Sequence, residues 1–171
     1  MTSSSIIDQL SHAAAIYDDW SALAPYFDGG NCSNGIHLAV MVEPFLSYIL
    51  TGRKTIESRF SKNLIAPYQR ISTGDLVFLK AGPVVAAFRA SSVECVGLDA
   101  KERKRLRESY SDAICADDSF WEQRDNRNYA TLIGIECVER LTPVQVPKRD
   151  RRGWLVLRTP RTIGPGQLTL M

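Results

Sequence analysis

The segment Gly52–Arg59 holds the densest group of side chains able to bind or transform an anionic ligand. Side chains alternate along an extended chain, so Glu57 and Arg59 share a face and can form an ion pair that holds the guanidinium for an anionic or planar ligand. Lys54 lies beside that pair, where it can contact a phosphate or, if buried among arginines, lose its proton and act as a base. The alternative is a solvated charged turn, whose surface ion pairs contribute ~0.2–1 kcal/mol each.

A second candidate group combines aromatic rings with a cation. Phe120 and Trp121 precede Arg124 by a few residues. A nucleobase can stack on Trp121 while Arg124 binds its phosphate, as in proteins that bind single strands. The alternative is that both rings cover the open end of a barrel.

Metal binding has one weak candidate in the sequence. Asp117, Asp118 and Glu122 are spaced to hold a hydrated Mg²⁺ or Mn²⁺ if the fold brings them to a cleft. Asp118 alternatively caps a helix. Two histidines and four cysteines lie far apart without a CxxC pair, so no zinc-site spacing exists. No cofactor is certain from the sequence; if an ion is used, we expect Mg or Mn.

The charge is nearly balanced but unevenly distributed. Lys and Arg total 21 against 19 for Asp and Glu, a formal net charge of +2. Two runs, residues 101–107 and 148–152, are nonetheless strongly basic. They favour a polyanionic partner such as RNA, with solvated charged faces as the alternative.

We expect neither a membrane span nor a secretion signal from this sequence. The apolar run Ile36–Leu50 is the best candidate for a membrane span, but Glu43 and Pro44 interrupt it. The first residues lack a basic and an apolar region of the kind that signal peptides carry. We therefore expect a cytoplasmic protein with free thiols and no membrane contact, and the oligomeric state stays open.

The elements that must position these side chains fall into two parts. Apolar residues at three- and four-residue spacing predict a helix from Ile6 to about Leu23, and a glycine-rich stretch follows it. Residues 1–35 are therefore expected to be a helical extension and residues 36–171 the domain proper. In that domain we expect strands at 36–42, 76–79, 84–96, 129–138 and 154–157, and helices at 44–50, 99–110 and 118–125. This order predicts an α+β fold, a small mixed sheet or partly closed barrel surrounded by helices.

Residues 36–158 resemble the ASCH (activating signal cointegrator homology) domain family of the PUA-like superfamily. The resemblance rests on Glu43-Pro44-Phe45 before a helix, Gly52-x-Lys54-Thr55-x-Glu57-x-Arg59 after it, and Gly74-Asp75-Leu76-Val77 at a strand start. It implies a small mixed β-barrel with an extra N-terminal helix here, and a cleft lined by the signature segment. The family is associated with RNA binding; some members are metal-stimulated ribonucleases and others amidohydrolases on acylated cytidine.

The resemblance assigns roles to Lys54, Tyr48, Glu57 and Arg59, and the position of other residues in the sequence adds further candidates. Lys54 and Tyr48 form the preferred catalytic pair, because a phenol and an amine can share acid and base roles on a 2′-hydroxyl and a leaving oxygen. Thr131 is a further catalytic candidate and, with Tyr129, is expected to face the cleft. Ligand-binding candidates are Glu57, Arg59, Thr55, Arg53, Tyr129 and Arg124.

The resemblance leaves the type of activity open. We expect RNA or a nucleotide-derived ligand, bound by a hydrolase or by a non-catalytic RNA-binding module. A ribonuclease is favoured over an amidohydrolase, because Glu57 stands where amidohydrolase-like members have a nucleophilic threonine. Thr55 or Ser58 would have to replace that hydroxyl.

Overall fold

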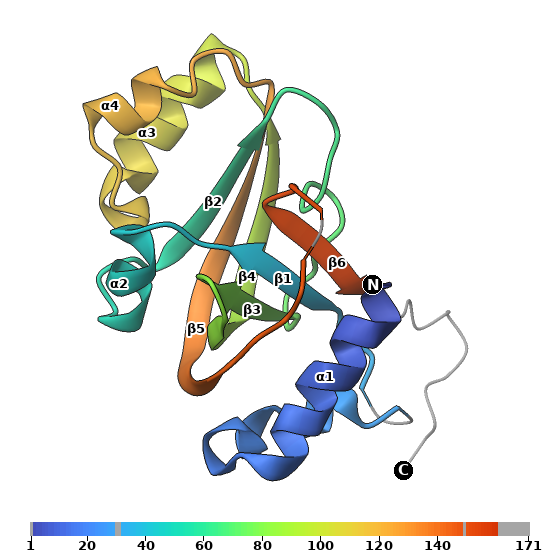
Figure 1. The fold of residues 1–171 in the computed structure, drawn as a ribbon. Coiled ribbons are helices and arrows are strands. Elements are labelled where there is room, and N and C mark those ends of the chain that lie inside the picture. Colours follow the sequence, from blue (N-terminus) through green and yellow to red (C-terminus); the bar gives the residue numbers. More distant parts are fainter. Residues whose placement is uncertain (1, 30–31, 149, 161–171) are drawn as a thin grey trace, which may run out of the picture.

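A six-stranded mixed sheet forms the centre of the molecule in the computed structural model, which describes residues 2–29, 32–148 and 150–160 (Figure 1). The strand order is β2-β5-β4-β3-β1-β6, and only the β1–β3 pair is parallel. The strands are β1 (Ile36–Val40), β2 (Ile56–Ser61), β3 (Leu76–Lys80), β4 (Val84–Gly97), β5 (Tyr129–Val144) and β6 (Trp154–Arg158). Register shifts along β4 bend the two longest strands, so the sheet curls instead of lying flat.

The curled sheet brings its two edges near each other, and Arg59 connects them. Arg59 on edge strand β2 donates to Val40 O, at the end of β1, over 3.0 Å, and to Gly153 O, just before β6, over 3.3 Å. A side chain thus bridges a gap that backbone hydrogen bonds leave open. The predicted α+β fold, a partly closed barrel surrounded by helices, is confirmed.

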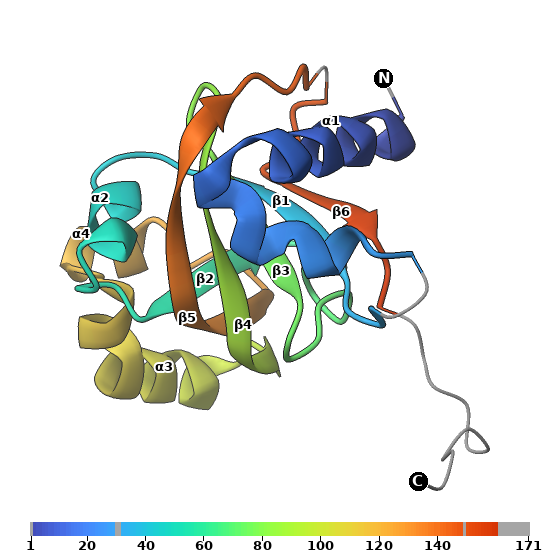
Figure 2. The ribbon, with the colours of Figure 1, turned by 90° about the horizontal axis from the view of Figure 1, so that it is seen from below.

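The N-terminal residues cover one face of the sheet (Figure 2). Helix α1 (Ser3–Ile16) and the 3₁₀ helix η1 (Asp18–Phe27) share a core with β1 and β3. Trp20 has no exposed surface, and its ring stacks on Phe78 of β3 at 5.6 Å. Residues 3–27 therefore complete a core of the sheet.

The expected single helix to Leu23 is wrong. The chain breaks at Tyr17, which is extended, and continues as η1. Tertiary contacts account for the break, because Trp20 Nε1 donates to Thr142 O at 2.9 Å and the Asp19 carboxylate accepts from the Thr142 N–H at 2.5 Å. These bonds to β5 replace the continued helical path that apolar spacing alone predicts.

Three helices cover the other side of the molecule: α2 (Phe45–Leu50), α3 (Ala100–Ile114) and α4 (Asp118–Glu122) (Figure 1). Asp99 caps α3, accepting from Glu102 N at 2.7 Å. Helix α3 runs four residues beyond the expected end, and α4 ends three residues early. Strand β5 extends to Val144, because its pairing with β4 continues that far.

A buried polar network connects β1, β3 and β6. Asp75 and His37 have no exposed surface, and Asp75 Oδ2 lies 3.0 Å from His37 Nε2. Trp154 Nε1 lies 3.2 Å from His37 Nδ1. An indole N–H can only donate, so Nδ1 accepts and the His37 proton sits on Nε2, where it is donated to Asp75. The Trp154 ring in turn lies 5.3 Å from the Arg59 guanidinium, so this network supports the wall of the cleft described next.

Candidate functional site

A cleft of about 310 Å³ lies between edge strand β2, the β1–α2 connection and the segment around α4. Its charged lining consists of four cations and one carboxylate: Lys54, Arg59, Arg124, Arg127 and Glu57. Its apolar lining includes three aromatic rings: Phe45, Phe60 and Phe120. A concave site with this charge excess and aromatic walls suits a planar, anionic ligand.

Lys54 is the most deeply buried cation of the cleft. It is 3% exposed, and its Nζ lies 3.0 Å from Ile114 O and 3.5 Å from Glu57 Oε2. The amine also lies 5.2 Å from the centre of the Phe45 ring. Burial lowers the pKa of Lys54, and the nearby Glu57 carboxylate opposes part of that shift. Lys54 is thus a buried amine that loses its proton more readily than a surface lysine.

Glu57 and Arg59 form the ion pair that alternation along the strand predicts. Glu57 is 4% exposed, and its Oε1 accepts from Arg59 Nε at 2.8 Å. The other nitrogens of Arg59 donate to Val40 O, Gly153 O and Met41 Sδ. Since a guanidinium has five N–H groups, one N–H of Nη1 remains for a ligand. Arg59 therefore serves chiefly to hold the cleft together.

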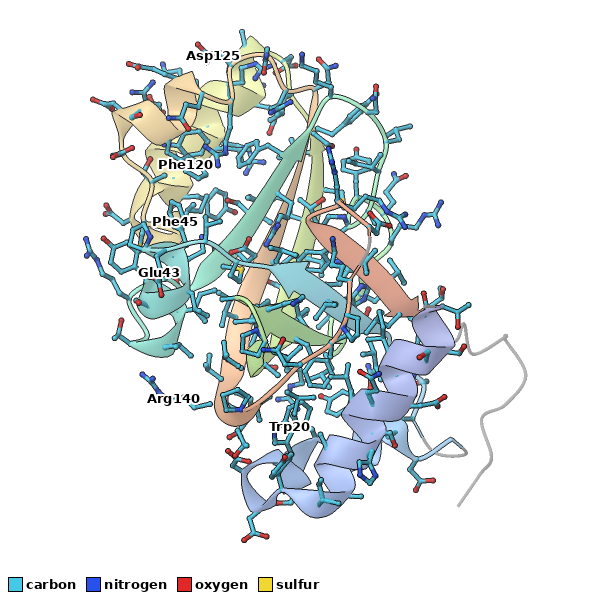
Figure 3. The ribbon with its side chains drawn as sticks, in the orientation of Figure 1. Trp20, Glu43, Phe45, Phe120, Asp125 and Arg140 are labelled. Atoms are coloured by element: carbon cyan, nitrogen blue, oxygen red, sulfur yellow. The ribbon has the colours of Figure 1, made fainter. Side chains whose placement is uncertain are left out.

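Arg124 and Arg127 provide the uncommitted positive charge. The Arg124 guanidinium lies 3.5 Å from the centre of the Phe120 ring, and Nη1 donates to Phe120 O. Burial lowers the pKa of Arg124, with a smaller contribution from Arg127. Within the described ranges neither arginine has a carboxylate partner. Figure 3 shows Phe120 on α4 facing Phe45 on α2, and their rings lie 5.9 Å apart.

The free edge of β2 contributes backbone groups to the cleft. Thr55 O accepts from Ile135 N–H, which fixes the alternation of hydrogen bonds along the β2–β5 pair. The N–H and C=O groups of Ser58 and Phe60 therefore point away from β5, on the side of the cleft that both residues line. An edge strand of this kind offers regularly spaced donors and acceptors to a ligand.

The preferred catalytic pair is divided between two cavities. Tyr48 lines a separate cavity together with Arg53, whose guanidinium lies 4.3 Å from the centre of the tyrosine ring. The Lys54 side chain lines the cleft instead, although its backbone N–H donates to Tyr48 O. Arg53 and Lys54 are neighbours in the sequence, but Arg53 lines the cavity of Tyr48 and Lys54 lines the cleft.

Three further predicted residues do not line the cleft either. Thr55 is exposed and contributes backbone hydrogen bonds, one of them to Ala113 O. Tyr129 packs against Tyr68, with ring centres 5.0 Å apart. Thr131 is 1% exposed and lies opposite Arg59 in the β2–β5 pair, so both side chains are on the same face of the sheet. Thr131 is buried there and does not line the cleft.

Trp121 and the acidic group have structural partners. Trp121 is 8% exposed, its Nε1 donates to Ser111 Oγ, and it lines a neighbouring cavity instead of this cleft. Asp117, not Asp118, caps α4 by accepting from Phe120 N, and Asp118 pairs with Arg107 at 2.5 Å. Across residues 2–29, 32–148 and 150–160, no three acidic, histidine or cysteine side chains gather to hold a metal ion, so the expected Mg²⁺ or Mn²⁺ set does not form.

The two basic runs are largely neutralised within the molecule. On α3, Lys104, Arg105 and Arg107 pair with carboxylates, and Arg103 donates to backbone carbonyls of the segment after α4. In the second run Arg152 pairs with Asp150, and Arg149 lies outside the described residues. None of the described helices is long and apolar enough to cross a bilayer.

Comparison with known proteins identifies the fold. No family model matches the sequence, and no curated protein matches it. Three crystal structures of the ASCH protein from Zymomonas mobilis do match: the protein itself and two variants, a serine-to-alanine and a tyrosine-to-phenylalanine change. The TM-scores are 0.58 for the protein itself, 0.59 for the serine variant and 0.57 for the tyrosine variant. The sequences are 11% or 12% identical, and the matches cover 72% or 74% of this chain and 87% to 91% of the matched chains. The chain therefore has an ASCH-like fold, as the motif resemblance predicts.

Sequence reasoning missed part of the cleft wall. Met41, Phe60 and Gln123 line the cleft, and no motif or spacing singled them out. The one available signal was position: Phe60 follows Arg59 on the strand that carries the signature. The main-chain oxygens of Val40 and Ile114, which hold Arg59 and Lys54, have no sequence signal at all.

Proposed function

We propose that the cleft binds RNA or a nucleotide-derived ligand. The observation that carries this proposal is the charge of the lining, four cations against the single carboxylate of Glu57, beside three aromatic rings. Phosphate groups match the uncommitted guanidinium groups of Arg124 and Arg127, and a base matches the aromatic walls. The ASCH-like fold supports the proposal, because the resembled family is associated with RNA binding.

Binding of single-stranded RNA tests this proposal directly. Fluorescence anisotropy with a labelled RNA decamer, at several salt concentrations, compares Arg124→Gln with Arg140→Gln. Both changes remove one arginine charge, and Figure 3 shows Arg140 near the end of β5, away from Phe120. We expect Arg124→Gln to weaken binding and to reduce the salt slope by about 0.7, the value for one lost phosphate contact on a single strand.

Two results would contradict the proposal. One is no binding by the wild-type protein at low salt. The other is equal weakening by Arg124→Gln and Arg140→Gln, which would show attraction to the protein's overall charge and no contact in the cleft.

Hydrolysis of RNA is a second candidate function, favoured by the buried amine of Lys54. An amine with a lowered pKa is neutral in a larger fraction of molecules, and a neutral amine can take the proton of a 2′-hydroxyl. Since the Tyr48 side chain lines another cavity, this mechanism assigns the base to Lys54 alone. A denaturing gel of end-labelled RNA with wild type and Lys54→Met, in Mn²⁺ or EDTA, should show cleavage that the variant lacks.

An amidohydrolase has less support. Thr55 does not line the cleft. Ser58 does, but in the part of the chain that is described its buried Oγ has no hydrogen-bond partner. A serine becomes a nucleophile when an adjacent base takes its proton, and Ser58 has none in contact.

A further inference from the structure

A second cavity of about 260 Å³ adjoins the cleft on the other side of Arg124, beside α3. Phe60 and Arg124 line both cavities, so the two are adjacent and these side chains stand between them. The apolar residues of the second cavity are Phe60, Leu98, Leu106 and Trp121, and its basic residues are Arg103, Lys104, Arg107 and Arg124. Asp125 is its one carboxylate.

We propose that this second cavity is a base subsite, which takes an unpaired nucleobase next to a phosphate held at Arg124. The inference rests on the proposed function and extends it: the ligand is a single strand of at least two nucleotides. The occupant is a base because an apolar floor beneath a basic rim matches an aromatic ring attached to a phosphate backbone.

The size and lining of the cavity fit one base. Its volume is below the ~300–1,000 Å³ of pockets that hold an entire small ligand. Phe60 and Trp121 meet nearly at right angles, with ring centres 5.8 Å apart, and form a rigid floor. Contacts through such a floor recognise the ring and discriminate little among bases.

Arg124 is placed to hold the phosphate between the two cavities. Its guanidinium is fixed against Phe120, and its pairing with a phosphate would connect a base in the cleft to one in the subsite. The rim is preformed on one side, because Arg103 donates to Leu98 O and Arg124 O and so ties α3 to the segment after α4.

Lys104 is the rim cation best able to reach a ligand. Its side chain is 75% exposed, and its only ion pair among the described residues is a 3.8 Å contact with the equally solvated Glu108. Exposed pairs of this kind contribute little to stability, so Lys104 can exchange Glu108 for a phosphate. Lys101, three residues earlier on α3, is exposed and does not line the cavity, which makes it a matched control.

The test compares two probes, uridine monophosphate and a single-stranded RNA tetranucleotide, by titration calorimetry. We expect the tetranucleotide to bind the wild-type protein about tenfold more tightly, within the range that one stacked base provides. Lys104→Glu should remove most of that advantage without changing the affinity for the mononucleotide, and Lys101→Glu should change neither. Leu98→Gln, which makes the floor polar without altering the charge, should weaken the tetranucleotide alone.

Other outcomes separate the subsite from the proposed function. If the mononucleotide binds but the tetranucleotide binds no more tightly, the subsite is refuted and the cleft still binds its ligand. Equal weakening by Lys104→Glu and Lys101→Glu also refutes the subsite, because it shows a general charge effect. If neither probe binds, the proposed function fails and the subsite fails with it.

Discussion

Replacing Asp75 with asparagine tests whether each buried donor of the network beneath the cleft has the acceptor that the geometry assigns to it. The Asp75 carboxylate has no exposed surface and accepts from Gly35 N at 2.7 Å, Ser72 N at 2.9 Å and His37 Nε2 at 3.0 Å. Asparagine keeps one oxygen, which can take the place of Oδ2 and accept from Ser72 N and His37 Nε2. Its amide nitrogen then faces the N–H of Gly35, which is also a donor.

In the opposite orientation the amide nitrogen would face Ser72 and His37, and the network cannot adapt by moving the His37 proton. His37 Nδ1 already accepts from the indole N–H of Trp154, so a proton placed there would face another donor. Asp75→Asn therefore loses one bond to a charged acceptor and leaves the buried Gly35 N–H unpaired, a cost of about 1.5–3 kcal/mol in unfolding free energy.

Urea denaturation followed by tryptophan fluorescence measures this loss. The matched control is Asp99→Asn at the start of α3, where asparagine caps a helix as well as aspartate does, and we expect its midpoint to match wild type. A loss below about 1 kcal/mol for Asp75→Asn would refute the hydrogen-bond assignment, because that value corresponds to one ordinary neutral bond.

Two further predictions concern the cleft lysine and the N-terminal core. Burial places the folded-state pKa of Lys54 below its usual 10.5. The unfolding free energy of the wild type should therefore rise relative to that of Lys54→Met as the pH increases from that lowered pKa toward 10.5. Urea denaturation of both proteins across pH 7–10.5 measures this, and a constant difference between their unfolding free energies would contradict the prediction. Trp20→Phe removes the hydrogen bond to Thr142 O and part of a fully buried ring. The unfolding free energy should therefore fall by about 1–3 kcal/mol, seen as a lower Tm in thermal unfolding. An unchanged Tm would contradict the role of Trp20 in the N-terminal core.

The local elements followed from the sequence because their causes are local. Asp99 is a strong cap with its acceptor three residues from the amide it binds, so the start of α3 was predictable. Glu57 and Arg59 are two residues apart on a strand, so their shared face follows from alternation alone. The motif resemblance likewise rested on short spacings, and the fold it implied is the one observed.

The composition of the cleft depended on contacts between distant parts of the chain. Lys54 is buried because Ile114, sixty residues later, supplies the carbonyl that holds its amine. Tyr48 is only six residues from Lys54 and yet lines another cavity, together with Arg53, the residue next to Lys54. Spacing along the chain does not report such directions.

By itself, the sequence determined the position of most helices and strands, the signature segment and the charges available to it, since propensity, capping and alternation act within a few residues. Only the tertiary structure decided that Arg59 would connect two sheet edges and that Arg124 would lie between two cavities. The reason is physical: burial, desolvation and hydrogen bonding to main-chain oxygens depend on which distant segments meet. That depends on how the sheet curls, and not on any single stretch of residues.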